Sequence, residues 1–160
     1  MKIVFLGNPN VSVSILSSLL KTENDIVGVL SNSPKISGRG LKKRYTPLGL
    51  YAINKKLKLL CLSSFKDEKL YRALKKLNPD LFIVVAFKII PQKFLNIPKL
   101  GAINLHASLL PNYRGASPIQ YALLNGDKKT GVTTFFMDDK IDNGKIIMQK
   151  EFKINDNDNY

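Results

Sequence analysis

Apolar runs that suit β-strands alternate along the chain with stretches whose apolar residues recur at helical spacing. The first run covers residues 2–6, and the next covers residues 26–30. Between them, four apolar residues share one helical face: Ile15, Leu16, Leu19 and Leu20. Strands that alternate with helices are typical of βαβ units. The pattern therefore predicts an α/β fold with a Rossmann-like, open, mostly parallel sheet and helices on both faces.

The same alternation continues to the end of the chain. Further strands are predicted at 59–62, 80–87, 102–106, 131–137 and 145–152, and further helices from Pro47, over 70–77 and over 118–124. The run at 80–87 is almost continuously apolar, as expected of a central strand covered on both faces. Residues 31–46 are rich in Gly, Ser and Lys and are predicted to form a long loop.

Two common nucleotide-binding motifs are missing from the sequence. The first strand runs into the turn Gly7-Asn8-Pro9-Asn10 rather than G-x-G-x-x-G, and no G-x-x-x-x-G-K-[ST] loop follows any strand. With one histidine and one cysteine, the chain offers a poor ligand set for zinc, and we expect no metal. The cysteine, Cys61, has leucines around it, which predicts a thiol in a buried strand.

The chain is strongly basic. Twenty-five Lys and Arg against 12 Asp and Glu give a formal charge of +13 over 160 residues. Such a charge attracts polyanions, and nucleic acid is the obvious partner. The alternative is compositional: a genome biased toward A and T enriches every protein in Lys, Asn and Ile.

Asn104 and His106 are the first candidates for a reactive site. They stand two residues apart at the end of a predicted strand, so their side chains point to the same face. Open α/β sheets place ligands at the carboxyl ends of their strands, which would put an amide and an imidazole in one crevice. The alternative is a polar pair whose hydrogen bonds are satisfied within the fold.

Residues around this pair resemble a known family. Asn104-Leu105-His106 is followed by Ser108-Leu109-Leu110-Pro111, and Asp142-Asn143-Gly144 comes some thirty residues later. This arrangement resembles the folate-dependent formyltransferases. The longer form Ser-Leu-Leu-Pro-x-Tyr-Arg-Gly-Ala-Ser-Pro-Ile, residues 108–119, is similar to the methionyl-tRNA formyltransferase family in particular.

The resemblance implies catalytic roles for Asn104, His106 and Asp142. The acceptor amine would attack the formyl carbon of 10-formyltetrahydrofolate, and Asn104 and His106 would stabilise the oxyanion of the tetrahedral intermediate. Asp142 would orient His106 and help to move a proton from the amine to the leaving nitrogen. Asp138 and Asp139 lie in the same loop and are expected to be solvated carboxylates.

The resemblance also implies two binding regions. Folate contacts map onto two groups of residues, for which ordinary core packing is the alternative: Ser108, Leu109, Leu110 and Pro111, and then Phe87, Lys88, Ile89 and Ile90. A basic loop is similar to the family's insertion that reaches the acceptor end of tRNA, and its expected contacts are Arg39, Lys42, Lys43 and Arg44. A solvated basic loop is the alternative.

The implied protein is a cytoplasmic monomer that acts on initiator methionyl-tRNA and folate, without membrane association. We expect a catalytic domain over residues 1–154, cut short at its carboxyl-terminal end relative to the family, and a disordered tail at 155–160. Two alternatives stay open. One is a formyltransferase for glycinamide ribonucleotide or a nucleotide-sugar amine; the other is an inactive remnant with a basic RNA-binding surface.

Overall fold

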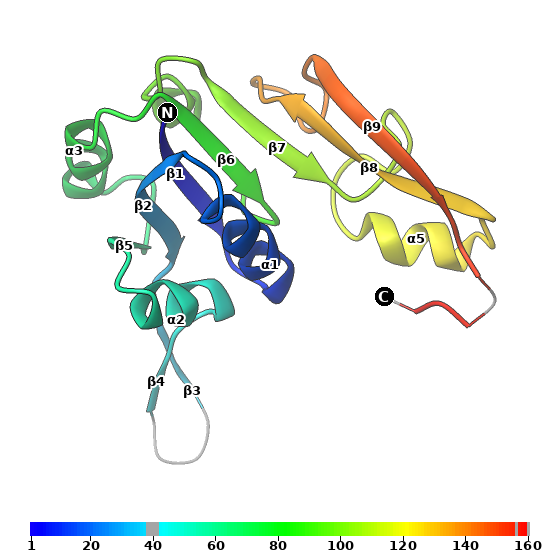
Figure 1. The fold of residues 1–160 in the computed structure, drawn as a ribbon, viewed down its shortest axis with the longest axis horizontal. Coiled ribbons are helices and arrows are strands. Elements are labelled where there is room, and N and C mark those ends of the chain that lie inside the picture. The colour runs from blue at the N-terminus through cyan, green and yellow to red at the C-terminus, as the bar shows by residue number, and fades with distance from the viewer. Residues whose placement is uncertain (38–41, 156, 160) are drawn as a thin grey trace. The chain divides into compact units, whose positions relative to one another are not determined.

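The structure, a computed structural model, describes residues 1–37, 42–155 and 157–159. The chain divides into two compact units, Met1–Ala102 (unit 1) and Ile103–Tyr160 (unit 2), whose elements are labelled in Figure 1.

Unit 1 contains a parallel sheet. Its strands are β1 (Lys2–Gly7), β2 (Asp25–Asn32), β5 (Leu59–Leu62) and β6 (Leu81–Val85), in the order β5-β2-β1-β6. Residues 3–6 of β1 are at most 1% exposed, because this central strand has a neighbour on each side. The predicted parallel arrangement is confirmed, although β6 is shorter than the predicted 80–87.

Helices lie on both faces of this sheet. Ser12, in α1 (Asn10–Leu19), donates a buried 2.9 Å hydrogen bond to the carbonyl of Val85 and packs directly on Gly7. On the opposite face, Leu77 packs on Gly28 at the end of α3 (Glu68–Lys76). Two further helices are α2 (Pro47–Asn54) and the short α4 (Gln92–Leu95), which the apolar pattern did not predict.

The predicted loop over 31–46 contains regular structure. Lys35–Ser37 (β3) and Lys42–Arg44 (β4) form an antiparallel two-stranded hairpin, so the loop prediction is wrong for these residues. The pattern gave no strand signal because the hairpin buries no apolar face: Ile36 is 61% exposed.

Cys61 is exposed, which contradicts the predicted buried thiol. It lies in β5, an edge strand of the unit 1 sheet, and its side chain points to the face opposite that of buried Leu62. The apolar residues next to Cys61 in the sequence therefore do not indicate whether its own side chain is buried.

Unit 2 is built on antiparallel strands. β7 (Ala102–His106) pairs with β8 (Lys129–Phe136), and β8 pairs with β9 (Ile146–Lys153). In this register His106 stands opposite Thr133, and Thr133 stands opposite Gln149. One helix, α5 (Pro118–Leu124), belongs to the same unit. In the part of the chain that the structure describes, no helix is long and apolar enough to span a membrane.

A methyl group at Gly7 is expected to destabilise unit 1. The added β-carbon would lie 2.5 Å from Ser12 Oγ and 2.8 Å from the Val85 carbonyl oxygen, which belongs to the backbone of β6. Overpacking of this kind costs about 1–3 kcal/mol, so Gly7→Ala should lower the free energy of unfolding by that amount in a urea titration.

Gly28→Ala is the matched control. A β-carbon at Gly28 would lie 2.8 Å from Leu77 Cδ1, the same distance as that from a Gly7 β-carbon to the Val85 carbonyl. Leu77 Cδ1, however, is the end of a side chain that can rotate away. The control should lose clearly less stability, and equal losses would show that the backbone contact at Gly7 is not what matters.

Candidate active site

Asn104 and His106 occupy one face of β7, as their spacing predicts. Both lie on the strand that pairs with β8, and His106 is 7% exposed while Asn104 is partly exposed. A buried imidazole needs hydrogen-bond partners, and the partners of His106 come from two segments later in the chain.

Asp142 joins these segments. Its Oδ2 accepts a 2.8 Å hydrogen bond from the backbone N–H of Gly115 and lies 3.5 Å from His106 Nδ1. Its Oδ1 accepts from Asn104 Nδ2 at 3.5 Å. The Asp142 side chain is 13% exposed. The structure therefore brings Asn104, His106 and Asp142 together within unit 2.

The loop that carries Asp142 is fixed by close backbone contacts. Arg114 Nε donates to the carbonyl of Asp142 at 2.9 Å, and Asp142 itself has a positive φ of 46°. Gly144 has no room for a side chain, since a β-carbon there would lie 1.7 Å from the Phe136 carbonyl oxygen. These contacts hold the carboxylate toward β7. Asp138 and Asp139, expected to be solvated, are exposed.

His106 lies between two acceptors. Its Nε2 is 2.8 Å from the backbone carbonyl of Tyr113, which can only accept, so Nε2 carries a proton. Its Nδ1 faces the Asp142 carboxylate. The two contacts together hold the ring in one orientation.

Tyr113 is itself held by its side chain. Its hydroxyl donates to Asp127 Oδ2 at 2.7 Å and accepts from Asn125 Nδ2 at 2.9 Å. The bond to Asp127 raises the pKa of Tyr113 above the ordinary tyrosine value, because ionisation would remove the donated proton. In the sequence, Tyr113, Arg114 and Gly115 stand out only as part of a family motif. Their contacts with His106 and Asp142 could not be read from spacing.

The segment 108–111 follows Asn104 and His106 in the chain, and two of its residues are buried. Ser108 and Leu110 are buried, whereas Leu109 is partly exposed and Pro111 is exposed. Ser108 Oγ donates to the Asn112 carbonyl at 2.6 Å. A folate contact from this segment is thus left to Leu109, Pro111 and the backbone, and it stays a prediction.

Thr133 fastens this segment to the sheet. Its Oγ1 donates to the Ser108 carbonyl at 2.7 Å and accepts from Leu110 N at 3.1 Å and Gln149 Nε2 at 2.9 Å. Gln149 Nε2 also donates to the Leu110 carbonyl at 2.8 Å. No pattern in the sequence marks these two polar residues, because their contacts depend on the register of β8 and β9.

The remaining binding predictions fall in unit 1. Phe87 is partly exposed, Lys88 and Ile89 are exposed, and Ile90 is buried at 5%. In the basic loop, Lys43 and Arg44 are exposed on β4, Lys42 is in the same strand, and Arg39 lies outside the described residues. Contacts of either group with a substrate stay predictions.

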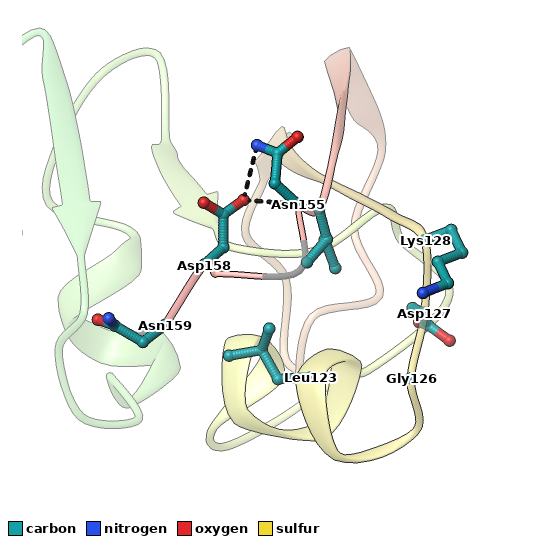
Figure 2. A pocket seen from close by; sticks show the side chains of 8 residues that line it. Leu123, Gly126, Asp127, Lys128, Asn155, Asp158 and Asn159 are labelled. Carbon is teal, nitrogen blue, oxygen red and sulfur yellow. Dashed lines mark hydrogen bonds between the residues drawn. The ribbon is translucent and has the colours of Figure 1, made fainter.

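A pocket of about 330 Å³ in unit 2 does not coincide with the cluster of Asn104, His106 and Asp142. It lies where β8 begins and β9 has ended, and Asp127, Asn155 and Asp158 are among its lining residues (Figure 2). None of Asn104, His106 and Asp142 lines it. Within the described residues, no group of three or more His, Cys, Asp and Glu could hold a metal ion.

Residues 1–160 match the family described as formyl transferase, and the chain belongs to that family. Among its relatives is the methionyl-tRNA formyltransferase of Flavobacterium psychrophilum, 50% identical over 99% of this chain and 51% of the relative. The methionyl-tRNA formyltransferase of Bacteroides thetaiotaomicron is 46% identical over 99% of this chain and 49% of the relative. The chain thus spans about half the length of the curated relatives it matches.

Solved structures agree on the fold. The structure resembles phosphoribosylglycinamide formyltransferase from Bacillus halodurans with a TM-score of 0.80 and 19% identity, over 99% of this chain and 83% of that chain. The same enzyme from Anaplasma phagocytophilum gives a TM-score of 0.79 and 24% identity, over 99% and 75%. The predicted Rossmann-like α/β class and the resemblance to formyltransferases are confirmed.

Loss of the Thr133 hydroxyl is expected to loosen the 108–111 segment. Thr133→Val keeps the shape of the side chain but leaves the buried Leu110 N–H without its acceptor, at a cost of about 1–3 kcal/mol. A urea titration measures the loss. Thr134→Val is the control, because the Thr134 hydroxyl makes only a 3.4 Å contact with the Met148 carbonyl, and we expect a change within about 0.5 kcal/mol. Similar losses in both variants would contradict the role given to Thr133.

Proposed function

We propose that this chain transfers a formyl group from 10-formyltetrahydrofolate to the amino group of initiator methionyl-tRNA, in support of translation initiation. The observation that carries the proposal is the contact of one carboxylate, Asp142, with both Asn104 and His106. The names of relatives at 46–50% identity support the choice of acceptor. The relatives are about twice as long as this chain, so the acceptor needs its own test.

Formyl transfer replaces one C–N bond with another. The acceptor nitrogen attacks the formyl carbon, the bond to the donor nitrogen breaks, and the proton lost by the amine ends on the donor nitrogen. Between these steps the formyl oxygen carries a negative charge, which preorganised donors stabilise. Asn104 Nδ2 can act as such a donor, because its 3.5 Å bond to Asp142 is long and leaves the amide able to turn to a substrate oxygen.

Both ring nitrogens of His106 face acceptors, the Tyr113 carbonyl and the Asp142 carboxylate, which fixes the ring beside the face of β7 that Asn104 shares. In its protonated form the ring would stabilise the oxyanion by its positive charge. Asp142 keeps this ring oriented, and its carboxylate is the base nearest to the site for receiving the amine proton. The backbone N–H of Gly115 donates to this carboxylate at 2.8 Å and holds it in position.

Donor binding is assigned to Leu109 and Pro111, because these two residues are at least partly exposed next to Asn104, His106 and Asp142. Buried Ser108 and Leu110 hold the segment in place. Cytoplasmic localisation follows from the proposed acceptor, since aminoacylated tRNA is used there. We also keep the monomeric state as a proposal.

Acceptor choice is tested by competition. The purified chain is given 10-formyltetrahydrofolate with methionyl-tRNA, glycinamide ribonucleotide, or both, and the formylated products are separated and counted. We expect formyl-methionyl-tRNA to form and an excess of glycinamide ribonucleotide to leave its rate unchanged. Preferential formylation of the nucleotide would replace the proposed acceptor. No transfer by a chain that melts cooperatively would favour the inactive RNA-binding alternative.

The role of Asp142 is tested by a matched pair of substitutions in one loop. The amide of Asp142→Asn still accepts from Gly115 N–H and tolerates the positive φ, but it carries no charge and cannot act as a base. Asp142→Asn should therefore lower kcat by about 10²-fold or more. Asp139→Asn makes the same chemical change at an exposed position and should keep wild-type kcat. Equal activities of the two variants would remove Asp142 from the mechanism.

A further inference from the structure

The positive charge of this chain is unevenly distributed. Residues 1–102 hold 18 of the 25 Lys and Arg but only 5 of the 12 Asp and Glu. The whole net charge of +13 therefore belongs to unit 1, and unit 2, which carries Asn104, His106 and Asp142, is neutral overall. A compositional bias of the genome would raise Lys in both units, so it does not account for this separation.

Only part of this charge lies in the basic loop that is expected to contact tRNA. A second concentration covers residues 55–76, with eight cations and two carboxylates. Both carboxylates are engaged: Asp67 caps the start of α3 by accepting from Lys69 N at 2.8 Å, and Glu68 pairs with Lys93. With both carboxylates counted, residues 55–76 still carry a net charge of +6.

Four of these cations form a continuous surface on α3. Lys69, Arg72 and Lys76 are three and four residues apart, so they share one face of the helix, and Lys75 lies beside them. All four side chains are exposed, whereas the buried residues Leu70 and Leu74 face the sheet. None of the four pairs with a carboxylate that the structure describes.

Helix stability explains only half of this surface. Lys75 and Lys76 lie in the last turn, where cations are favoured by the helix dipole. Lys69 lies in the first turn, where the dipole disfavours a cation, and Arg72 lies in the middle, where it gains nothing from either end. An unpaired basic face kept against the helix dipole is suited to an external polyanion.

Lys58 extends the surface beyond the helix. The backbone carbonyl of Lys58 and the side chain of Leu77 both lie beside Gly28, so the segment that precedes β5 and the end of α3 are neighbours. The Lys58 side chain is exposed. The segment next to the end of α3 therefore adds a fifth exposed cation, and all five belong to elements separate from the hairpin.

We propose that this α3 surface, formed by Lys58, Lys69, Arg72, Lys75 and Lys76, binds backbone phosphates of the tRNA acceptor. The choice of tRNA rests on the proposed function; the choice of phosphate rests on the charge and exposure of the surface. Contacts of this kind position an RNA without reading its sequence, and they release counterions on binding. The α3 surface and the hairpin then form two separate groups of phosphate contacts on unit 1.

The test is the salt dependence of binding to deacylated initiator tRNA, which needs no formyl transfer. The variant Lys69→Gln, Arg72→Gln, Lys76→Gln removes three charges and keeps residues that favour a helix. Each lost phosphate contact lowers the slope of log Kd against log salt by about 0.7–0.9. We therefore expect a slope lower by about two and weaker binding at low salt.

The control removes the same charge elsewhere. Lys21, Lys150 and Lys153 are exposed and unpaired with the carboxylates that the structure describes, and their triple change to Gln should leave the slope near that of wild type. Equal weakening of tRNA binding in both triple variants would overturn the proposal, because net charge alone would then explain the effect. A chain that formylates methionyl-tRNA while its α3 variant binds like the control would overturn this inference and leave the proposed function standing. An inactive chain whose α3 variant shows the expected slope change would overturn the proposed function and leave this inference standing.

Discussion

One carboxylate, that of Asp142, joins three segments of unit 2 that are far apart in sequence: residues 104–106, 113–115 and 138–144. A largely desolvated carboxylate is costly unless donors surround it. Here the Gly115 N–H, the Asn104 amide and the His106 ring face its two oxygens. The loop is held by the hydrogen bond from Arg114 Nε to the Asp142 carbonyl, and Gly144 lies too close to Phe136 for any side chain.

Much of this arrangement could be predicted from the sequence, for identifiable reasons. The parallel sheet of unit 1 follows from apolar runs that alternate with helical spacing, because burial dominates both signals. Asn104 and His106 could be paired because side chains two residues apart on a strand share a face. Asp142 could be identified only through a family resemblance. The turn and the whole of β8 separate it from His106, and no local periodicity spans that distance.

Other features were beyond a reading of the sequence. The hairpin of β3 and β4 buries no apolar face, so it leaves no alternation to detect. The apolar neighbours of Cys61 predict a buried thiol, yet its strand lies at the edge of the sheet and its side chain is exposed. Thr133 and Gln149 hold the 108–111 segment through a register that forms only when the strands pair. The concentration of charge in unit 1 became meaningful only once the unit boundary was known.

The central claim is that His106 and Asp142 act as one catalytic unit, and a double-mutant cycle tests it most directly. Single-turnover rates of formyl transfer to methionyl-tRNA would be measured for wild type, His106→Ala, Asp142→Asn and the double variant. Residues that act together give strongly non-additive effects, so the double variant should be about as slow as the slower single variant. Losses that add, with the double variant slower by the product of the two single effects, would contradict the account and assign the two side chains independent roles.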